Sequence, residues 1–108
     1  MSVSEKRTDK IGNTKLEVFE RDGWRCVVTI KGHRCPDRAR QAAHVLPRDK
    51  PHLARYGDEV INHPANMLST CGLRHNAMVQ INYRSHPVEA DRHAELVREI
   101  IAREAGEA

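Results

Sequence analysis

The sequence is poor in aromatic residues and in cysteine, and it has no long hydrophobic run. Its 108 residues include one Phe, one Trp and two Tyr. A chain of this length forms one compact domain, and with so few bulky apolar side chains it buries only a thin core. We therefore expect an interaction other than apolar burial to help stabilise the fold.

The cysteine content argues against a disulfide-stabilised secreted protein. Cys26, Cys35 and Cys71 are the three cysteines, and an odd number cannot all pair within one chain. No N-terminal apolar segment indicates export, and no apolar run approaches the roughly 20 residues that a membrane-spanning helix needs. We expect a soluble protein in a reducing compartment, with thiolates available to bind a metal.

Basic residues gather in one part of the chain. The formal net charge is +3 and the sequence pI is about 9.0. The C-terminal segment is rich in Glu, so the positive charge is concentrated earlier. This distribution suits a polyanionic partner such as nucleic acid, and the alternative is an ordinary solvated surface. The basic residues concerned are Arg21, Arg25, Lys31, Arg34, Arg38, Arg40, Arg48, Lys50 and Arg55.

The first regular element is expected shortly after the N-terminus. Residues 1–13 are polar and charged without apolar periodicity, which is typical of a flexible basic arm. Thr14 and Glu17 form a capping box, and Gly23 offers a helix end. The pattern predicts a short helix over residues 14–22.

Short extended segments and a long loop are expected next. Residues 26–30 and 41–46 are β-prone, and the second segment places His44 near its end. Residues 47–65 hold three prolines and little periodicity, which predicts a long connecting loop. A brief strand is expected at residues 67–69.

Two helices are expected in the C-terminal part. Residues 73–82 are predicted to form a helix with His75 in its first turn. The last helix is expected to begin after Ser85, a suitable N-cap, with Pro87 in the first turn. It is predicted to be amphipathic, with an apolar stripe that runs through Val88, Leu96, Val97, Ile100 and Ile101.

Three motifs follow one another as strand, loop with strand, and helix. They are Ala-His-Val-Leu-Pro at 43–47, Pro-Ala-Asn-Met-Leu at 64–68 and Cys-Gly-Leu-Arg-His-Asn at 71–76. Together with Phe-Glu-Arg-Asp-Gly-Trp-Arg-Cys at 19–26, they resemble the His-Asn-His (HNH) endonuclease family. The resemblance covers roughly residues 16 to 80.

The resemblance implies a fold and a reaction. The fold is α+β, with a small ββα-metal core in a nuclease domain at 14–84, an N-terminal helix, a long connecting loop, and a C-terminal helix at 85–108 that packs on the domain. The implied reaction is hydrolysis of DNA phosphodiester bonds that leaves 5′ phosphates. His44 corresponds to the general base, Asn66 to the residue that fixes the loop of the base, and His75 to the ligand of a catalytic Mg²⁺, Mn²⁺, Ni²⁺ or Zn²⁺.

Ala43 departs from the family pattern. Many members of the family carry Asp or His just before the base, as a second ligand of the catalytic cation, and Ala43 has no ligand atom. His63, Asp49, Asn76 or a DNA phosphate are the alternatives that would complete the coordination, because Mg²⁺ takes few protein ligands and keeps several waters.

The structural zinc that the family often holds would need a different ligand set in this chain. Each Cys-x-x-Cys pair has lost its second cysteine, whereas Cys35 is an additional thiol. Cys26, Cys35 and Cys71 supply three ligands, and His33 is the nearest candidate for the fourth. His75 competes for that position, and if it binds there it cannot also hold the catalytic cation. Three free thiols are the remaining alternative.

The partner and setting follow from the same resemblance. Small free-standing HNH proteins are typical of bacteriophages and mobile elements, which implies the cytoplasm of a bacterial host. The alternative function is a catalytically inert, zinc-stabilised DNA-binding or packaging accessory. A third is a protein-interaction module in which the final helix forms a homodimer or binds a phage packaging partner. The residues expected to contact DNA are Arg21, Arg25, Arg40, Arg48, Lys50 and Arg74.

Overall fold

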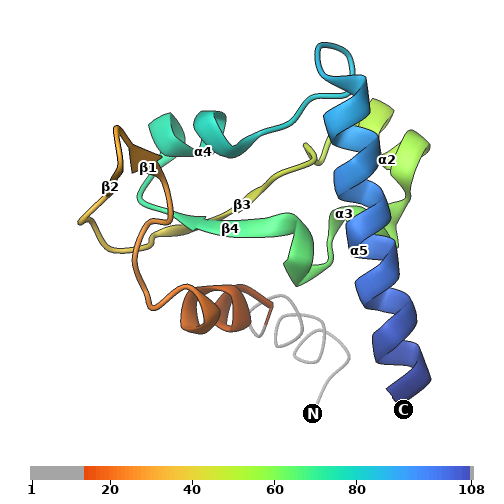
Figure 1. Cartoon of the computed structure of the whole chain (residues 1–108), viewed down its shortest axis with the longest axis horizontal. Coiled ribbons are helices and arrows are strands. Elements are labelled where there is room, and N and C mark those ends of the chain that lie inside the picture. Colours follow the sequence, from red (N-terminus) through yellow and green to blue (C-terminus); the bar gives the residue numbers. More distant parts are fainter. Residues whose placement is uncertain (1–13, 108) are drawn as a thin grey trace, which may run out of the picture.

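Two short antiparallel ribbons and a set of helices make up the fold (Figure 1). A computed structural model describes residues 14–107, so the arm expected at 1–13 lies outside the described residues. β1 (Thr29–Ile30) pairs with β2 (His33–Arg34), and β3 (Gln41–His44) pairs with β4 (Met67–Thr70). Residues 14–21 are helical. The later helices are α2 (Lys50–Tyr56), α3 (Asp58–Ile61), the 3-10 helix η1 (Pro64–Asn66), α4 (Leu73–Val79) and α5 (Pro87–Glu107). The expected α+β class is confirmed.

The N-terminal helix ends close to the expected position, at a turn that uses left-handed backbone. Gly23 has φ 71°, and Trp24 has φ 62°. The ring of Trp24 packs against Phe19 with ring centroids 5.4 Å apart. Val18 is fully buried, so the helix packs on the domain through this side chain.

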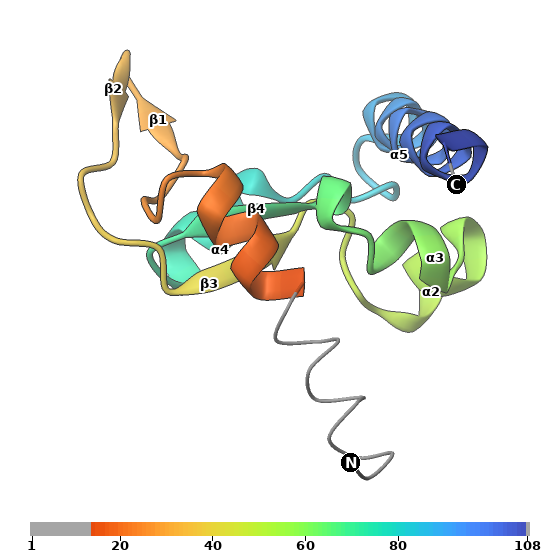
Figure 2. The same cartoon turned by 90° about the horizontal axis from the view of Figure 1, so that it is seen from below.

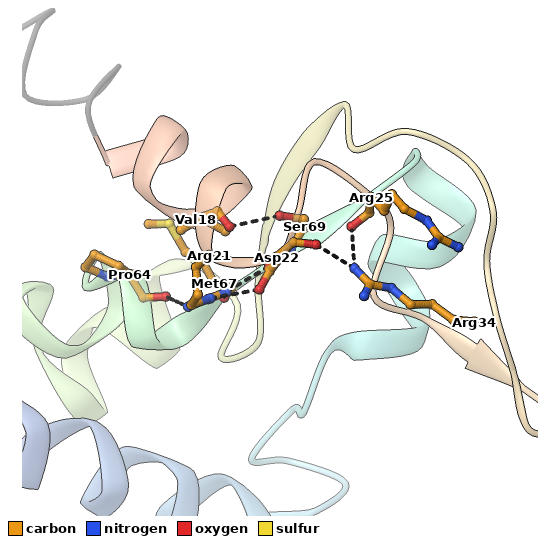
Figure 3. Close-up of polar contacts among 8 residues, drawn as sticks. All are labelled: Val18, Arg21, Asp22, Arg25, Arg34, Pro64, Met67 and Ser69. Carbon is orange, nitrogen blue, oxygen red and sulfur yellow. Dashed lines mark hydrogen bonds and ion pairs between the residues drawn. The ribbon is translucent and has the colours of Figure 1, made fainter.

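Arg21 and Asp22 attach the end of this helix to the segment around β4 (Figure 3). The Arg21 guanidinium pairs with Asp22 and donates to the carbonyl oxygens of Pro64 and Met67, at 3.0 and 2.6 Å. Asp22 in turn accepts the backbone N–H of Ser69 at 2.9 Å. Burial acts against ionisation here, but the bonds from Arg21 and Ser69 outweigh it and lower the pKa of Asp22.

Residues 47–65 are not the structureless loop that the sequence predicted. They form α2, α3 and η1, which are joined by tight turns. Asp49 caps α2 by accepting the backbone N–H of His52, and Gly57 separates α2 from α3 at φ 89°. His52, Tyr56 and Val60, four residues apart, are all buried. The prolines and charged residues of this segment led to the prediction of a loop, although these buried positions recur at helical spacing.

The register of β3 and β4 decides which way each side chain points. Gln41 pairs with Thr70, and His44 pairs with Met67. Side chains alternate between the two faces of a strand, so Gln41 and Ala43 share one face, and His44 lies on the other. Gln41 accepts a hydrogen bond from Asn76 of α4, which identifies its face as the one that α4 covers.

α5 packs on α3 and η1, but with a narrower face than expected. Its buried residues are Ala90, Ala94 and Val97. They join a core that also contains Leu46, Tyr56, Val60 and Ile61. The predicted apolar stripe is wrong at Val88 and Leu96, which are each 57% exposed. Two small alanines contribute to this contact together with Val97, and Ile101 packs against the same core.

None of the helices in residues 14–107 combines the length and the apolar character needed to cross a membrane.

Two neighbouring residues of α5 should respond differently to truncation. Val97→Ala removes buried methyl groups and should lower the free energy of unfolding by about 2 kcal/mol. Leu96→Ala removes a larger but exposed side chain and should change it by less than about 0.5 kcal/mol. Urea denaturation of both variants measures the difference, and equal losses would contradict this packing of α5.

Candidate functional site

Three cysteines and one histidine come together at one end of the β3–β4 ribbon. The ligand atoms of Cys26, Cys35, Cys71 and His75 all lie within 4.8 Å of one another. His75 Nδ1 is 3.2 Å from the sulfurs of Cys26 and Cys71, and the Cys35 and Cys71 sulfurs are 4.0 Å apart. Tetrahedral Zn²⁺ with Zn–S bonds of about 2.3 Å places thiolate sulfurs about 3.8 Å apart. The donor set and its spacing therefore fit a structural metal ion such as Zn²⁺.

Separate segments deliver these ligands. Cys26 follows the turn after the N-terminal helix, and its backbone N–H donates to Asp37. Cys35 follows β2, and its N–H donates to Val28 at 2.8 Å. Cys71 and His75 are four residues apart across the start of α4, a spacing that places both on one side of the helix.

Arg34 holds the β1–β2 hairpin against the segment that carries Cys26. Its guanidinium donates to the carbonyl oxygens of Asp22 and Arg25, at 2.6 and 3.2 Å (Figure 3). It also donates to the carbonyl oxygen of Cys26, at 3.0 Å. These bonds orient the carbonyl groups on both sides of the helix-ending turn. Arg34 is therefore engaged in positioning the metal-binding segment.

The thiols of this group ionise at different pH values. Burial alone would raise the pKa of Cys26, but hydrogen bonds from the Val28 backbone and from His75 lower it to about 7. Burial and the two neighbouring thiols raise the pKa of Cys71 to about 11. Cys26 is therefore a thiolate donor near neutral pH, and a bound cation would supply the charge needed to ionise Cys71.

The fourth member of the group is His75 and not His33. His33 lies on β2, is exposed, and is not a member of the group. The prediction that placed it there relied on closeness along the chain to Cys35. The start of α4 instead carries Cys71 and His75 to the sulfurs together.

The proposed base, His44, lies in a different environment. Its ring is half-buried at the end of β3, and Nε2 is 3.3 Å from Asn62 Oδ1. Burial, helped by the positive charge of Arg48, lowers the pKa of His44 below its usual value, although the contact with Asn62 opposes this shift. The ring is therefore neutral at pH 7 and can accept a proton.

His44 lines a pocket of about 740 Å³ at the surface. The pocket combines apolar surface with acidic and basic side chains, as ligand sites commonly do. Its lining comes from the N-terminal helix, β3, α3 and the turn into β4, and consists of Thr14, Lys15, Ala42, His44, Arg48, Asp58, Glu59, Asn62, His63, Pro64 and Met67.

The structure does not bring His44 and His75 together. α4 covers one face of the β3–β4 ribbon, and the N-terminal helix lies across the other (Figure 1). Figure 2 shows the same arrangement from below, with the N-terminal helix in front of the ribbon and α4 behind it. His44 shares its pocket with Lys15 of the N-terminal helix, whereas His75 belongs to the metal-binding group.

Asn66 fixes the backbone that follows His44. Its side chain is fully buried, and its Oδ1 accepts the N–H of Leu46 at 2.9 Å. Its Nδ2 donates to the carbonyl oxygens of Leu46 and Ile61, at 3.2 and 2.8 Å. The N–H of Val45 donates to the Asn66 carbonyl. These contacts tie the end of β3 to α3 and η1.

The residues expected to contact DNA are spread over the surface. Arg48 lines the His44 pocket. Arg21 is engaged with Asp22 and two backbone carbonyls, so its guanidinium is already held by the protein. The other four are exposed, namely Arg25, Arg40, Lys50 and Arg74.

Of the alternative ligands for a catalytic cation, only His63 lines the His44 pocket. Its Nε2 is 2.6 Å from Glu104 of α5. Asp49 is bound to His52 at 2.7 Å, away from the pocket lining. Asn76 lies on the α4 side, where it contacts Gln41 and Thr70.

Sequence reasoning missed Asn62 and Asp58. Asn62 contacts His44, and its own Nδ2 donates to Asp58 at 2.9 Å. The two residues are four positions apart at the two ends of α3. Recognising α3 as a helix would have placed them side by side, but the segment was interpreted as a loop.

Removal of the fourth ligand tests the metal centre. His75→Ala should lower the zinc content of the purified protein from about one ion per chain to well below half, because three thiolates alone leave the tetrahedral shell incomplete. His33→Ala is the matched control and should retain the ion. Elemental analysis of both proteins gives the answer, and loss of zinc from the His33 variant alone would restore the original ligand assignment.

Comparison of this chain with protein-family models, with curated proteins and with solved structures finds no match. The likeness to HNH endonucleases accordingly consists of the motifs at 19–26, 43–47, 64–68 and 71–76.

Proposed function

We propose that this protein is a DNA endonuclease in which His44 is the general base, stabilised by a separate Cys₃His metal centre. The observation that carries the proposal is the half-buried ring of His44, with a lowered pKa, at the wall of a surface pocket that Arg48 and Lys15 also line. A general base must be unprotonated at the working pH and accessible to water, and this ring satisfies both requirements.

Neighbouring side chains suit a phosphodiester substrate. Arg48 and Lys15 line the same pocket as His44 and offer positive charge to phosphate oxygens. Asn66 holds the backbone after His44 through buried hydrogen bonds, in agreement with the role that the resemblance implies. β3, β4 and α4 also come in the order of the ββα arrangement, with α2, α3 and η1 between the two strands.

The proposal differs from the family pattern in its metal binding. We assign His75 to the structural ion, which would lock α4 and the β1–β2 hairpin to the ribbon. Within residues 14–107, the Cys₃His group is the one cluster of three or more His, Cys, Asp or Glu ligands with suitable spacing. The residues around His44 thus do not form a protein ligand set for the divalent cation that the resemblance implies.

A second function is favoured by Ala43 and by the position of His75. Ala43 has no ligand atom at the position where many family members have one, and His75, the expected ligand of the catalytic cation, lies with the cysteines. A metal-stabilised DNA-binding or packaging accessory needs no such cation. This protein would retard DNA in a gel without cutting it.

Replacement of the base separates the two functions. His44→Ala should reduce plasmid nicking at least about 100-fold, because general-base catalysis contributes roughly that much. DNA affinity should remain within a few-fold, since phosphate contacts supply most of the binding. The assay uses supercoiled plasmid with Mg²⁺, Mn²⁺, Ni²⁺ and Zn²⁺ in parallel.

A matched histidine variant controls for changes in net charge and folding. His86→Ala changes an exposed residue that is absent from the pocket lining and should cut as the unmodified protein does. Absence of nicking by the unmodified protein with every cation, together with gel retardation, would favour the accessory. Equal loss of cutting and binding in His44→Ala would contradict its role as a base.

The pH dependence of cutting should follow the ionisation of His44. A lowered pKa means that the neutral, active form persists to a pH below the ordinary value of about 6.5. The rate at low substrate concentration should rise with pH along an acid limb whose midpoint lies below about 6.5, and it should be level at neutral pH. A midpoint above 7 would show that a different group, or a cation-bound water, controls the rate.

A further inference from the structure

We infer that Asp58 and Asn62 are positioning residues that fix the tautomer of His44, so that Nδ1 is the nitrogen that accepts the proton from water. The inference deepens the proposed function and rests on it for its catalytic consequence. Its structural part, namely which ring nitrogen of His44 carries the hydrogen, can be tested without an activity assay.

The carboxylate of Asp58 determines how the Asn62 amide is oriented. Asp58 Oδ1 lies 2.9 Å from Asn62 Nδ2. An ionised carboxylate only accepts hydrogen bonds, so the NH₂ group of the amide must face it. The amide oxygen then faces the other way, toward His44.

The amide oxygen determines the state of the imidazole. Asn62 Oδ1 lies 3.3 Å from His44 Nε2. An amide oxygen has no proton to donate, so His44 Nε2 must carry the hydrogen of this bond. In the neutral ring, one nitrogen carries the hydrogen and the other has the free lone pair. Nδ1 is therefore the basic nitrogen.

α3 holds the two residues in this geometry. Asp58 is its first residue and Asn62 its C-cap, and the backbone N–H of Asn62 donates to the Asp58 carbonyl at 2.9 Å. Val60 and Ile61 of the same helix are buried in the core, which anchors α3 beside β3. A short, anchored helix gives the pair little freedom to rotate away from His44.

The chemical step balances with one water molecule. His44 Nδ1 takes a proton from water, the hydroxide oxygen forms a bond to phosphorus, and the bond from phosphorus to the 3′ oxygen breaks. The 3′ oxygen leaves with the bonding pair and takes a proton from solvent. Nε2–H continues to donate to Asn62, and the imidazolium then returns its extra proton to water.

The acidic and basic groups that line the pocket surround this step. Asp58, through the amide of Asn62, favours the imidazolium that forms. Glu59 of α3 adds negative charge, whereas Arg48 and Lys15 add positive charge near the phosphate position. Arg48 also acts on the base, because its positive charge disfavours the imidazolium and so opposes the effect of Asp58.

Histidine ring NMR measures the tautomer directly. In ¹⁵N-labelled protein at pH 8, His44 of the unmodified chain should show predominantly the Nε2–H form. Asn62→Leu removes the acceptor, and Asp58→Asn removes the group that orients the amide. Both variants should shift the ring toward a mixture of the two tautomers. Glu59→Gln removes the same charge from the adjacent residue and should leave the tautomer unchanged.

Kinetics then connect the tautomer with cutting. Asn62→Leu should lower kcat about 10- to 100-fold with KM for DNA within a few-fold, a loss typical of an orienting partner. Asn62→Asp keeps an acceptor oxygen and should restore the Nε2–H form and most of kcat.

The outcomes separate this inference from the nuclease proposal. Predominance of Nδ1–H in the unmodified chain, or an unchanged tautomer in both Asn62→Leu and Asp58→Asn, would overturn the inference even if the protein cuts DNA. The expected tautomers in a protein that never cuts would overturn the proposed function and leave the positioning pair established. A well-dispersed amide spectrum of each variant confirms that it is folded.

Discussion

The buried amide of Asn66 connects the two halves of the molecule. It bonds to Leu46 just after β3, to Ile61 at the end of α3 and, through Oδ1, to His93 of α5 at 3.1 Å. The Asn66 side chain has no exposed surface, and a buried amide without hydrogen bonds is costly. Leu46, Ile61 and His93 must therefore stay within hydrogen-bond distance of it. The position of His44, two residues before Leu46, follows from that arrangement, and the α3 pair Asp58 and Asn62 is placed beside it by the same contacts.

The molecule uses two means of stabilisation, one on each side of this connection. Around α2, α3 and α5, apolar and aromatic side chains form an ordinary core. Around the N-terminal helix, β1, β2 and α4, the described residues offer little apolar burial. Polar bonds of Arg21, Asp22 and Arg34 hold that side instead, and the Cys₃His group would add to them once it binds a metal ion.

Local signals predicted the elements whose boundaries are encoded nearby. The N-terminal helix, β3 with His44 at its end, β4 and the first turn of α4 all lie close to their expected places. The loop prediction for residues 47–65 was wrong because the packing of Tyr56 and Val60 against α5 is a tertiary contact, and the prolines and charges dominate the local pattern. The prediction of His33 as a ligand was wrong for a similar reason. Closeness to Cys35 along the chain does not imply closeness to the sulfurs, and His33 is exposed on β2, outside the Cys₃His group. The sequence could not predict which face of the ribbon carries His44, because this depends on the register of β3 and β4. The contact between Gln41 and Asn76 identifies that face only in the folded structure.

The four members of the Cys₃His group form two local pairs. Cys26 and Cys35 flank one short hairpin, Cys71 and His75 flank one helix turn, and Cys35 and Cys71 are 36 positions apart. Each pair can meet an ion without the rest of the fold, because closing a short loop costs little entropy. The unfolded chain would therefore have an appreciable affinity for zinc of its own. Ion binding to that state reduces the stability gained by the folded protein, so tight zinc binding and resistance to unfolding need not rise together in this chain.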